Sequence, residues 1–231
     1  MRRPYCRWLK LGVAVLLLAA AKVHGHEVSE EDISLISGKP GVQIALYGWL
    51  GAKHMVTGYD HLLFLAGVVF LLRRVRDIAV YVSLFAIGHT ITLMSGVVFG
   101  LAVNPYLVDA VIGLSVAYKG FDNLAGFQKL FGESPDDKLA VFLFGLFHGV
   151  GLATKLQDLG LHGDGLLVNL VAFNAGVELG QFVALCGIVI ILRVLKSGEY
   201  SSTIRVGVNA GLIVAGFSLM AFQLALYWNG G

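Results

Sequence analysis

Residues 54–72 read HMVTGYDHLLFLAGVVFLL. From Leu62 onward the stretch is wholly apolar, and the charged segment 73–77 follows it. Because a helix needs about 20 mostly apolar residues to cross the hydrocarbon core of a bilayer, the sequence predicts a transmembrane helix over approximately 55–72. Two histidines and an aspartate lie at its start, and ionisable residues inside a span are costly enough to be functional candidates.

The composition of the whole chain agrees with a membrane protein. Of 231 residues, 57% are hydrophobic and 14% are charged, whereas soluble domains average about 45–50% apolar and about 25% charged residues. These values exclude a disordered chain, a nucleic-acid-binding arm and an ordinary soluble enzyme. Five further spans are predicted, at 78–101, 106–123, 139–157, 166–194 and 204–228. The linkers are short, so we expect an all-α integral membrane protein whose six transmembrane helices form one domain over 55–231.

Residues 1–25 have the features of a cleaved secretory signal peptide. A positive start precedes a short apolar core over 11–21, and cleavage is expected after Ala21 or Gly25. The alternative is an uncleaved anchor helix. Residues 26–54 then form a lead-in segment on the outer face, part of it at the membrane interface.

Removal of the signal peptide reverses the sign of the net charge. The whole chain has 17 basic and 15 acidic residues, or +2. Cleavage after Ala21 removes four basic residues and leaves 13 against 15, or −2, and cleavage after Gly25 leaves 12 against 15, or −3. The new terminus carries His24 or His26 ahead of several acidic residues. It is either an outer metal-capturing segment, through amine and imidazole nitrogens, or a solvated acidic tail.

The distribution of basic residues predicts the orientation. A cleaved signal peptide places the mature N-terminus outside, and alternating crossings then place 73–77, 124–138 and 195–203 in the cytoplasm. Basic residues concentrate at these inner flanks, as the positive-inside rule requires: Arg73, Arg74, Arg76, Lys129, Lys138, Arg193, Lys196 and Arg205. The outer flanks hold only Lys22, Lys39, Lys53 and Lys155. We therefore expect a multi-pass protein of a bacterial-type inner membrane, with its mature N-terminus in the periplasm.

The polar group that opens the first span suggests metal binding. His54 and His61 are seven residues apart, which is two turns of helix, so both imidazoles are expected on one face. Asp60 lies about 100° around the helix from His61. It is either a ligand or a carboxylate that orients an imidazole of this helix or a neighbouring one.

Other spans carry more residues of the same type. His89 lies in the second span and His148 in the fourth, while the fifth has a polar stripe of Asn174, Glu178 and Gln181 at i, i+4 and i+7. Four histidines and two carboxylates in four apolar spans are more than interhelical hydrogen bonding usually needs. Neutral imidazole with carboxylate suits Ni²⁺, Co²⁺, Zn²⁺ or Cu²⁺. If the imidazoles share a site, their separations should be about 4–8 Å.

Several polar residues also have structural explanations. Lys119 and Asp122, at the end of the third span, are one turn apart and could pair, although Lys119 is expected to extend its ammonium to the interface. Asn174 and Gln181 could join helices by hydrogen bonds. Glycines around the candidate residues, such as Gly88, would let the helix backbones approach closely and bring side chains of separate helices together.

Four sequence blocks resemble the HupE/UreJ family of membrane proteins. They are the H-x5-D-H block with its following Leu-Leu-Phe-Leu at 54–65, and the blocks at 85–93, 144–149 and 173–181. The first block is also similar to the H-x4-D-H motif of the larger nickel–cobalt transporter family, with one extra residue. The resemblance implies a nickel or cobalt permease tied to hydrogenase or urease maturation. Its implied metal-handling set is His54, Asp60, His61, His89, His148 and Glu178, with Asn174, Gln181, Asp122 and Asn123 as accessories.

Three functions therefore compete. The favoured one is a transition-metal permease that moves Ni²⁺ or Co²⁺, with Zn²⁺ and Cu²⁺ as further candidates. The alternatives are an intramembrane metal-dependent hydrolase and a membrane assembly factor that does not transport. No tightly bound cofactor and no nucleic-acid partner are expected; the expected partners are the metal ion, the lipid bilayer, a metalloenzyme maturation system and a second copy of the chain.

Overall fold

The computed structural model describes residues 41–72, 74–101, 103–158, 165–195 and 202–230. The predicted signal peptide, His24 and His26 lie outside these residues. All regular secondary structure in the described residues is helical: α3 (Ile44–Thr57), α4 (Tyr59–Phe70), α5 (Val75–Phe99), α6 (Pro105–Asn123), α7 (Gly126–Phe131), α8 (Asp137–Asp158), α9 (Leu166–Leu195) and α10 (Ser202–Trp228).

Four of these helices are long and apolar enough to cross a membrane. They are α5, α8, α9 and α10, whose apolar stretches run over 25, 21, 27 and 27 residues. The chain is thus an all-helical, multi-pass membrane protein. The other two predicted spans differ: α4 has 12 residues, and α6 has 19 but contains Asp109, Lys119 and Asp122. Six crossings, and the orientation, remain predictions.

The helix ends follow the local sequence signals. Helix α5 ends at Phe99 and is capped by Gly100, which adopts a left-handed conformation with φ 65°. Helix α6 begins at Pro105, and the side chain of Asn104 accepts hydrogen bonds from the next two free backbone N–H groups. Asp136 does the same at the start of α8. These helix ends lie within one or two residues of the limits predicted for the spans at 101, 106 and 139.

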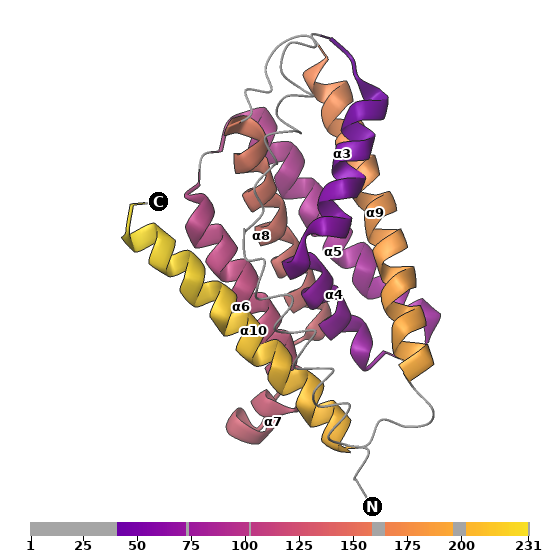
Figure 1. Cartoon of the computed structure of the whole chain (residues 1–231), viewed down its shortest axis with the longest axis vertical. Coiled ribbons are helices and arrows are strands. Elements are labelled where there is room, and N and C mark those ends of the chain that lie inside the picture. The colour runs from indigo at the N-terminus through magenta and orange to yellow at the C-terminus, as the bar shows by residue number, and fades with distance from the viewer. Residues whose placement is uncertain (1–40, 73, 102, 159–164, 196–201, 231) are drawn as a thin grey trace, which may run out of the picture.

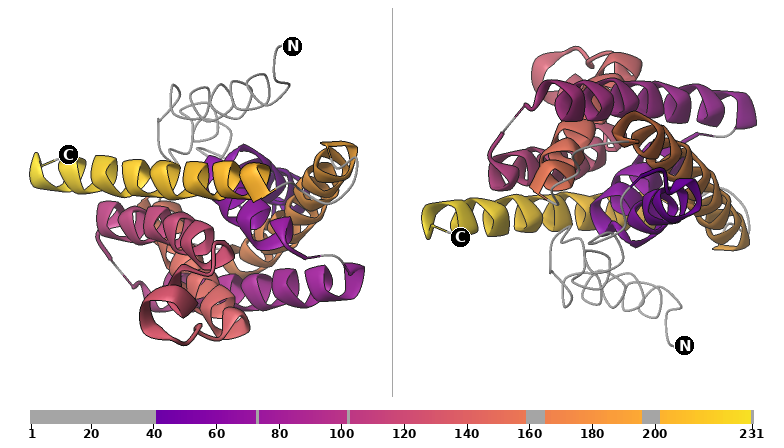
Figure 2. Two further views of the ribbon diagram at one scale, coloured as in Figure 1. Left: turned by 90° about the horizontal axis from the view of Figure 1, so that it is seen from below. Right: turned by 90° about the horizontal axis from the view of Figure 1, so that it is seen from above.

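The helices form a bundle around α4. Figure 1 shows α5, α6, α8, α9 and α10 running alongside one another, and the end-on views in Figure 2 show the indigo α4 segment among them. The most extensive helix contacts join α6 with α10, α5 with α8, and α3 with α9, while α4 contacts α3, α5, α6, α9 and α10. Residues of α4 are therefore placed where several helices meet.

Close backbone contact holds the helix pairs together. A Cβ on Gly149 of α8 would collide with the backbone carbonyl of His89 on α5. A Cβ on Gly176 of α9 would collide with the carbonyl of Gly48 on α3. The prediction that glycines allow the helices near the histidines to approach closely is confirmed at these two interfaces.

The first predicted span, 55–72, is wrong as one continuous helix. Helix α3 starts earlier, at Ile44, and Gly58 separates it from α4. Gly58 has ψ 98°, outside the helical range, and is buried. Non-helical backbone is tolerated at membrane depth where protein surrounds it. The described end of the segment expected to be an outer-face lead-in, from Ile44 to His54, is therefore helical and belongs to the bundle, since α3 packs along α9.

Candidate functional site

His61 lies at the start of α4, just after the break at Gly58, and only 1% of it is exposed. The Asp60 carboxylate accepts hydrogen bonds from the His61 backbone N–H at 2.7 Å and from His61 Nδ1 at 2.9 Å. Because a carboxylate accepts, Nδ1 carries the proton. Asp60 thus orients the His61 ring and leaves Nε2 as the ring's lone-pair nitrogen, as a carboxylate behind a metal-binding histidine does. Of the two roles predicted for Asp60, this geometry supports the orienting one.

His148 on α8 is oriented in a comparable way by the backbone. Its Nδ1 donates a hydrogen bond of 2.7 Å to the carbonyl of Phe144, one turn earlier. Its Nε2 is buried and has no hydrogen-bond partner among the described residues. A buried nitrogen lone pair without a donor is costly in a core of pure packing residues. It is the atom that a metal ion would use.

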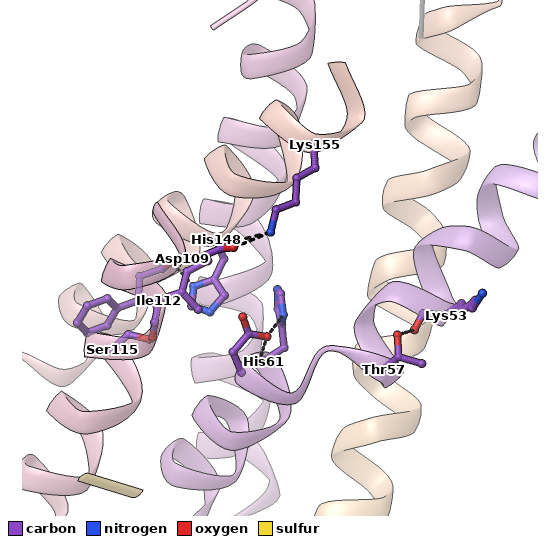
Figure 3. A network of polar contacts seen from close by, with 10 residues as sticks. Lys53, Thr57, His61, Asp109, Ile112, Ser115, His148 and Lys155 are labelled. Atoms are coloured by element: carbon purple, nitrogen blue, oxygen red, sulfur yellow. Dashed lines mark hydrogen bonds and ion pairs between the residues drawn. The ribbon is translucent and has the colours of Figure 1, made fainter. Parts of the chain in front are cut away.

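The rings of the other three histidines, His54, His89 and His148, lie around the ring of His61. Its ring centroid lies 4.8 Å from that of His148, 5.3 Å from that of His54 and 6.3 Å from that of His89. These three separations fall in the range predicted for a shared site. Figure 3 shows His61 and His148 side by side between their helices, and the planes of the two rings are at 69° to each other. We call these four residues the histidine cluster.

The broken first helix explains how His54 and His61 meet. Seven residues of continuous helix would separate them by about 10 Å along the axis. Their ring centroids are 5.3 Å apart because the chain turns at Gly58 and the two side chains approach from either side of the break. The prediction that both rings share one face of a straight helix is therefore wrong, although the predicted proximity is correct.

Aromatic side chains enclose the histidine cluster. Phe85 lies 5.0 Å from His148 and 6.3 Å from His61 between ring centroids, and Phe64 lies 5.6 Å from His148. Phe64 and Phe85 are fully buried. The imidazoles therefore lie in an apolar surrounding, where interactions with a cation are stronger than in water.

The cluster is not a closed metal cage. Among the described residues, no group of three or more His, Cys, Asp or Glu side chains is arranged to hold one ion. The distances between individual pairs of rings nevertheless suit an ion held by two imidazoles. An ion about 2.0–2.1 Å from nitrogen lies about 3 Å from the ring centroid, so two imidazoles on one tetrahedral ion have centroids about 5 Å apart. The 4.8 and 5.3 Å separations around His61 match this spacing.

The polar stripe of α9 lies apart from the ring contacts. Asn174 exchanges hydrogen bonds with the Thr90 hydroxyl of α5, at 3.0 and 3.2 Å. Gln181 is buried and donates to the carbonyl of Val82, also on α5. Glu178 is exposed and accepts from Asn174 at 3.4 Å. Asn174 and Gln181 thus join α9 to α5, and the structure gives Glu178 no contact with the histidine rings.

Asp122 and Asn123 belong to a separate polar group, which we call the amide–lysine tie. It comprises Lys119, Asp122, Asn123, Asp137 and Asn209. Lys119 donates to Asp122 at 2.6 Å and to Asp137 of α8 at 3.0 Å. Asn123 donates to the Gly67 carbonyl and to Asn209 of α10, both at 2.8 Å. The predicted pairing of Lys119 with Asp122 is confirmed, and Lys119 is only 5% exposed.

One buried ion pair was not predicted. Asp109 of α6 is 9% exposed and binds Lys155 of α8. The sequence does contain a sign of this pair, because Asp109 is an ionisable residue inside a predicted span. Lys155 had been counted only as a residue of an outer flank.

The fold and the site define a class: a multi-pass helical membrane protein in which imidazoles from four helices lie close together, three of them buried. The sequence model of one family, described as HupE / UreJ protein, matches residues 30–229. The chain therefore belongs to the HupE/UreJ family, as its four sequence blocks indicated. Comparisons with curated proteins and with solved structures gave no match.

Proposed function

We propose that the protein is a permease for a divalent transition metal, with Ni²⁺ and Co²⁺ as its main substrates. Membership of the HupE/UreJ family supports a link to nickel or cobalt transport, or to urease or hydrogenase maturation. The observation that carries the proposal is the position of His61. Its buried ring lies 4.8–6.3 Å from three imidazoles that come from α3, α5 and α8.

The geometry suits transfer from one pair of ligands to the next. His61 is common to all three ring pairs, so an ion held by His54 and His61 could pass to His61 and His148 without leaving the cluster. Each such pair is an incomplete coordination sphere, which gives modest affinity. Conduction requires sites strong enough to bind an ion and weak enough to release it. Neutral imidazole is a suitable ligand for both metals.

The chain's own residues prepare the rings for this role. Asp60 and the Phe144 carbonyl fix the Nδ1 protons of His61 and His148 and thereby present Nε2. Phe64 and Phe85 keep the surroundings apolar. The exposed Glu178 and the outer histidines His24 and His26 would act before or after the cluster.

The proposal is tested by uptake of radioactive Ni²⁺ into lipid vesicles that contain the purified protein. We expect uptake by the wild type and its loss in His61→Ala. Ser115→Ala is a matched control, because Ser115 is fully buried but its hydroxyl only bonds the Ile112 carbonyl of its own helix. This variant should transport as the wild type does.

Two results would favour the competing functions. Equal uptake by vesicles with the wild type, His61→Ala and no protein would exclude the permease and favour an assembly factor. One tightly held Zn²⁺ per chain after purification in the absence of added metal would favour a hydrolase.

A further inference from the structure

The ion pair between Asp109 and Lys155 has no part in the transfer path proposed above. Lys155 Nζ donates to both oxygens of the Asp109 carboxylate, at 2.8 and 3.1 Å. Their side chains are only 10% and 15% exposed. Burying two charges is expensive, and replacing such a pair by apolar groups is often neutral or stabilising. A pair of this kind in a membrane protein therefore requires a reason other than stability.

The pair lies next to the histidine cluster. His148, Gly151 and Lys155 occupy positions i, i+3 and i+7 of α8, on one face of the helix. A Cβ on Gly151 would be 3.8 Å from Asp109 Oδ1. The carboxylate is therefore about one helical turn, roughly 5 Å, from the level of His148. Figure 3 shows the Asp109–Lys155 pair directly above the His148 ring.

The two partners are not equally fixed. Lys155 lies in the last turn of α8, where the helix dipole favours a cation and a long side chain can reach out of the protein. The ammonium thus has a second favourable position. Asp109 lies within α6, is 9% exposed and has a short side chain, so its carboxylate has less freedom to move than the Lys155 ammonium.

We infer that Asp109 is a further metal-binding residue, and that Lys155 neutralises its carboxylate until a divalent cation displaces the ammonium. The inference rests on the proposed function. In the exchange, the contacts from Lys155 Nζ break, an Asp109 oxygen becomes a ligand of the metal, and the metal releases a water molecule. No proton is transferred. With the predicted orientation, Asp109 lies on the outer side of His148, so an ion that approaches this ring from the outer face meets the Asp109 carboxylate before it.

The second buried lysine provides a natural contrast. Lys119 is held by two carboxylates, Asp122 and Asp137. Asp137 lies eleven residues before His148 on α8, or about 16 Å along the helix axis. Removing the Asp137 carboxylate should therefore leave metal binding unchanged, and Asp137→Asn is the matched control.

The test measures Ni²⁺ binding by equilibrium dialysis to the full-length protein in lipid nanodiscs. Lys155→Met removes the competing ammonium, so we expect binding roughly tenfold tighter than in the wild type. The double variant Asp109→Asn/Lys155→Met has no buried charge at this place. We expect it to bind Ni²⁺ at least about tenfold more weakly than the wild type, because a metal-binding carboxylate is lost.

The double variant decides the question even if Lys155→Met does not fold. If the pair only joins α6 to α8, the double variant will bind Ni²⁺ with wild-type affinity, and the inference is wrong. His61→Ala separates this failure from that of the proposed function. Loss of binding in His61→Ala with a normal double variant overturns only the role of Asp109, whereas no binding by the wild type overturns both.

Discussion

The histidine cluster and the amide–lysine tie are both polar groups that lie largely inside an apolar helix bundle, but they differ in how their atoms are satisfied. In the tie, Lys119 binds two carboxylates, and Asn123 binds an amide and a carbonyl. In the cluster, the Nδ1 atoms of His61 and His148 are satisfied, while the buried Nε2 of His148 has no partner among the described residues. Polar atoms that are all paired, as in the tie, hold helices together, whereas a buried nitrogen without a partner is available to a ligand such as a metal ion.

Replacing a cluster residue by an apolar one should have the largest effect on metal binding. His148→Leu removes a ligand nitrogen, and we expect the affinity for Ni²⁺ to fall about a hundredfold. The side chain lies against Phe64 and Phe85, so leucine should pack there, and the free energy of unfolding should not fall. Dialysis and unfolding in a denaturing detergent measure the two quantities. A large loss of stability with unchanged affinity would show that His148 holds helices together, as the residues of the tie do, and does not bind metal.

The carboxylate behind His61 should have the next largest effect. Asp60→Asn keeps the size of the side chain but removes the charge that orients the ring. We expect the affinity for Ni²⁺ to fall about 10-fold, at the lower end of what such supporting residues contribute. Isothermal titration calorimetry measures the change. A variant that binds no metal at all would make Asp60 a direct ligand.

Much of this comparison was predictable from the sequence, and some of it was not. The helical class and the helix limits near 101, 106 and 139 followed from apolar run lengths, and the four histidines were candidates because they are ionisable residues inside apolar spans. The break at Gly58 was missed because residues 55–72 together have the length of one span, and a single glycine does not by itself end a helix. The partners of Asp109 and Asn123 lie 46 and 86 residues away, and no local pattern predicts such pairings.

A residue of the tie should affect stability but not metal binding. Asn123→Leu leaves the Gly67 carbonyl and the Asn209 side chain without this donor. We expect the free energy of unfolding to fall by about 1–3 kcal/mol. The Ni²⁺ affinity of the folded fraction should stay within about twofold of the wild type, since RT ln 2 is smaller than the effect of any ligand loss. A loss of affinity as large as that of Asp60→Asn would remove the distinction between the two groups.

The hydrogen bond between α5 and α9 should have the smallest effect. Thr90→Val removes the hydroxyl that exchanges hydrogen bonds with Asn174. Interhelical side-chain hydrogen bonds in membranes average about 0.6 kcal/mol, and we expect a loss of stability of this size. Metal uptake should not change. Reduced uptake in Thr90→Val at normal stability would show that Asn174 contributes to metal transport.

The central claim is that metal is bound by the nitrogens of the histidine cluster, with His61 as the shared ligand. X-ray absorption spectroscopy of the Ni²⁺-loaded protein tests it most directly. We predict imidazole nitrogens in the first coordination shell, at about the 2.0–2.1 Å that separates zinc from imidazole nitrogen, and loss of this signal in His61→Ala. A shell made only of oxygen atoms, or a nitrogen signal that is the same in His61→Ala, would contradict the account.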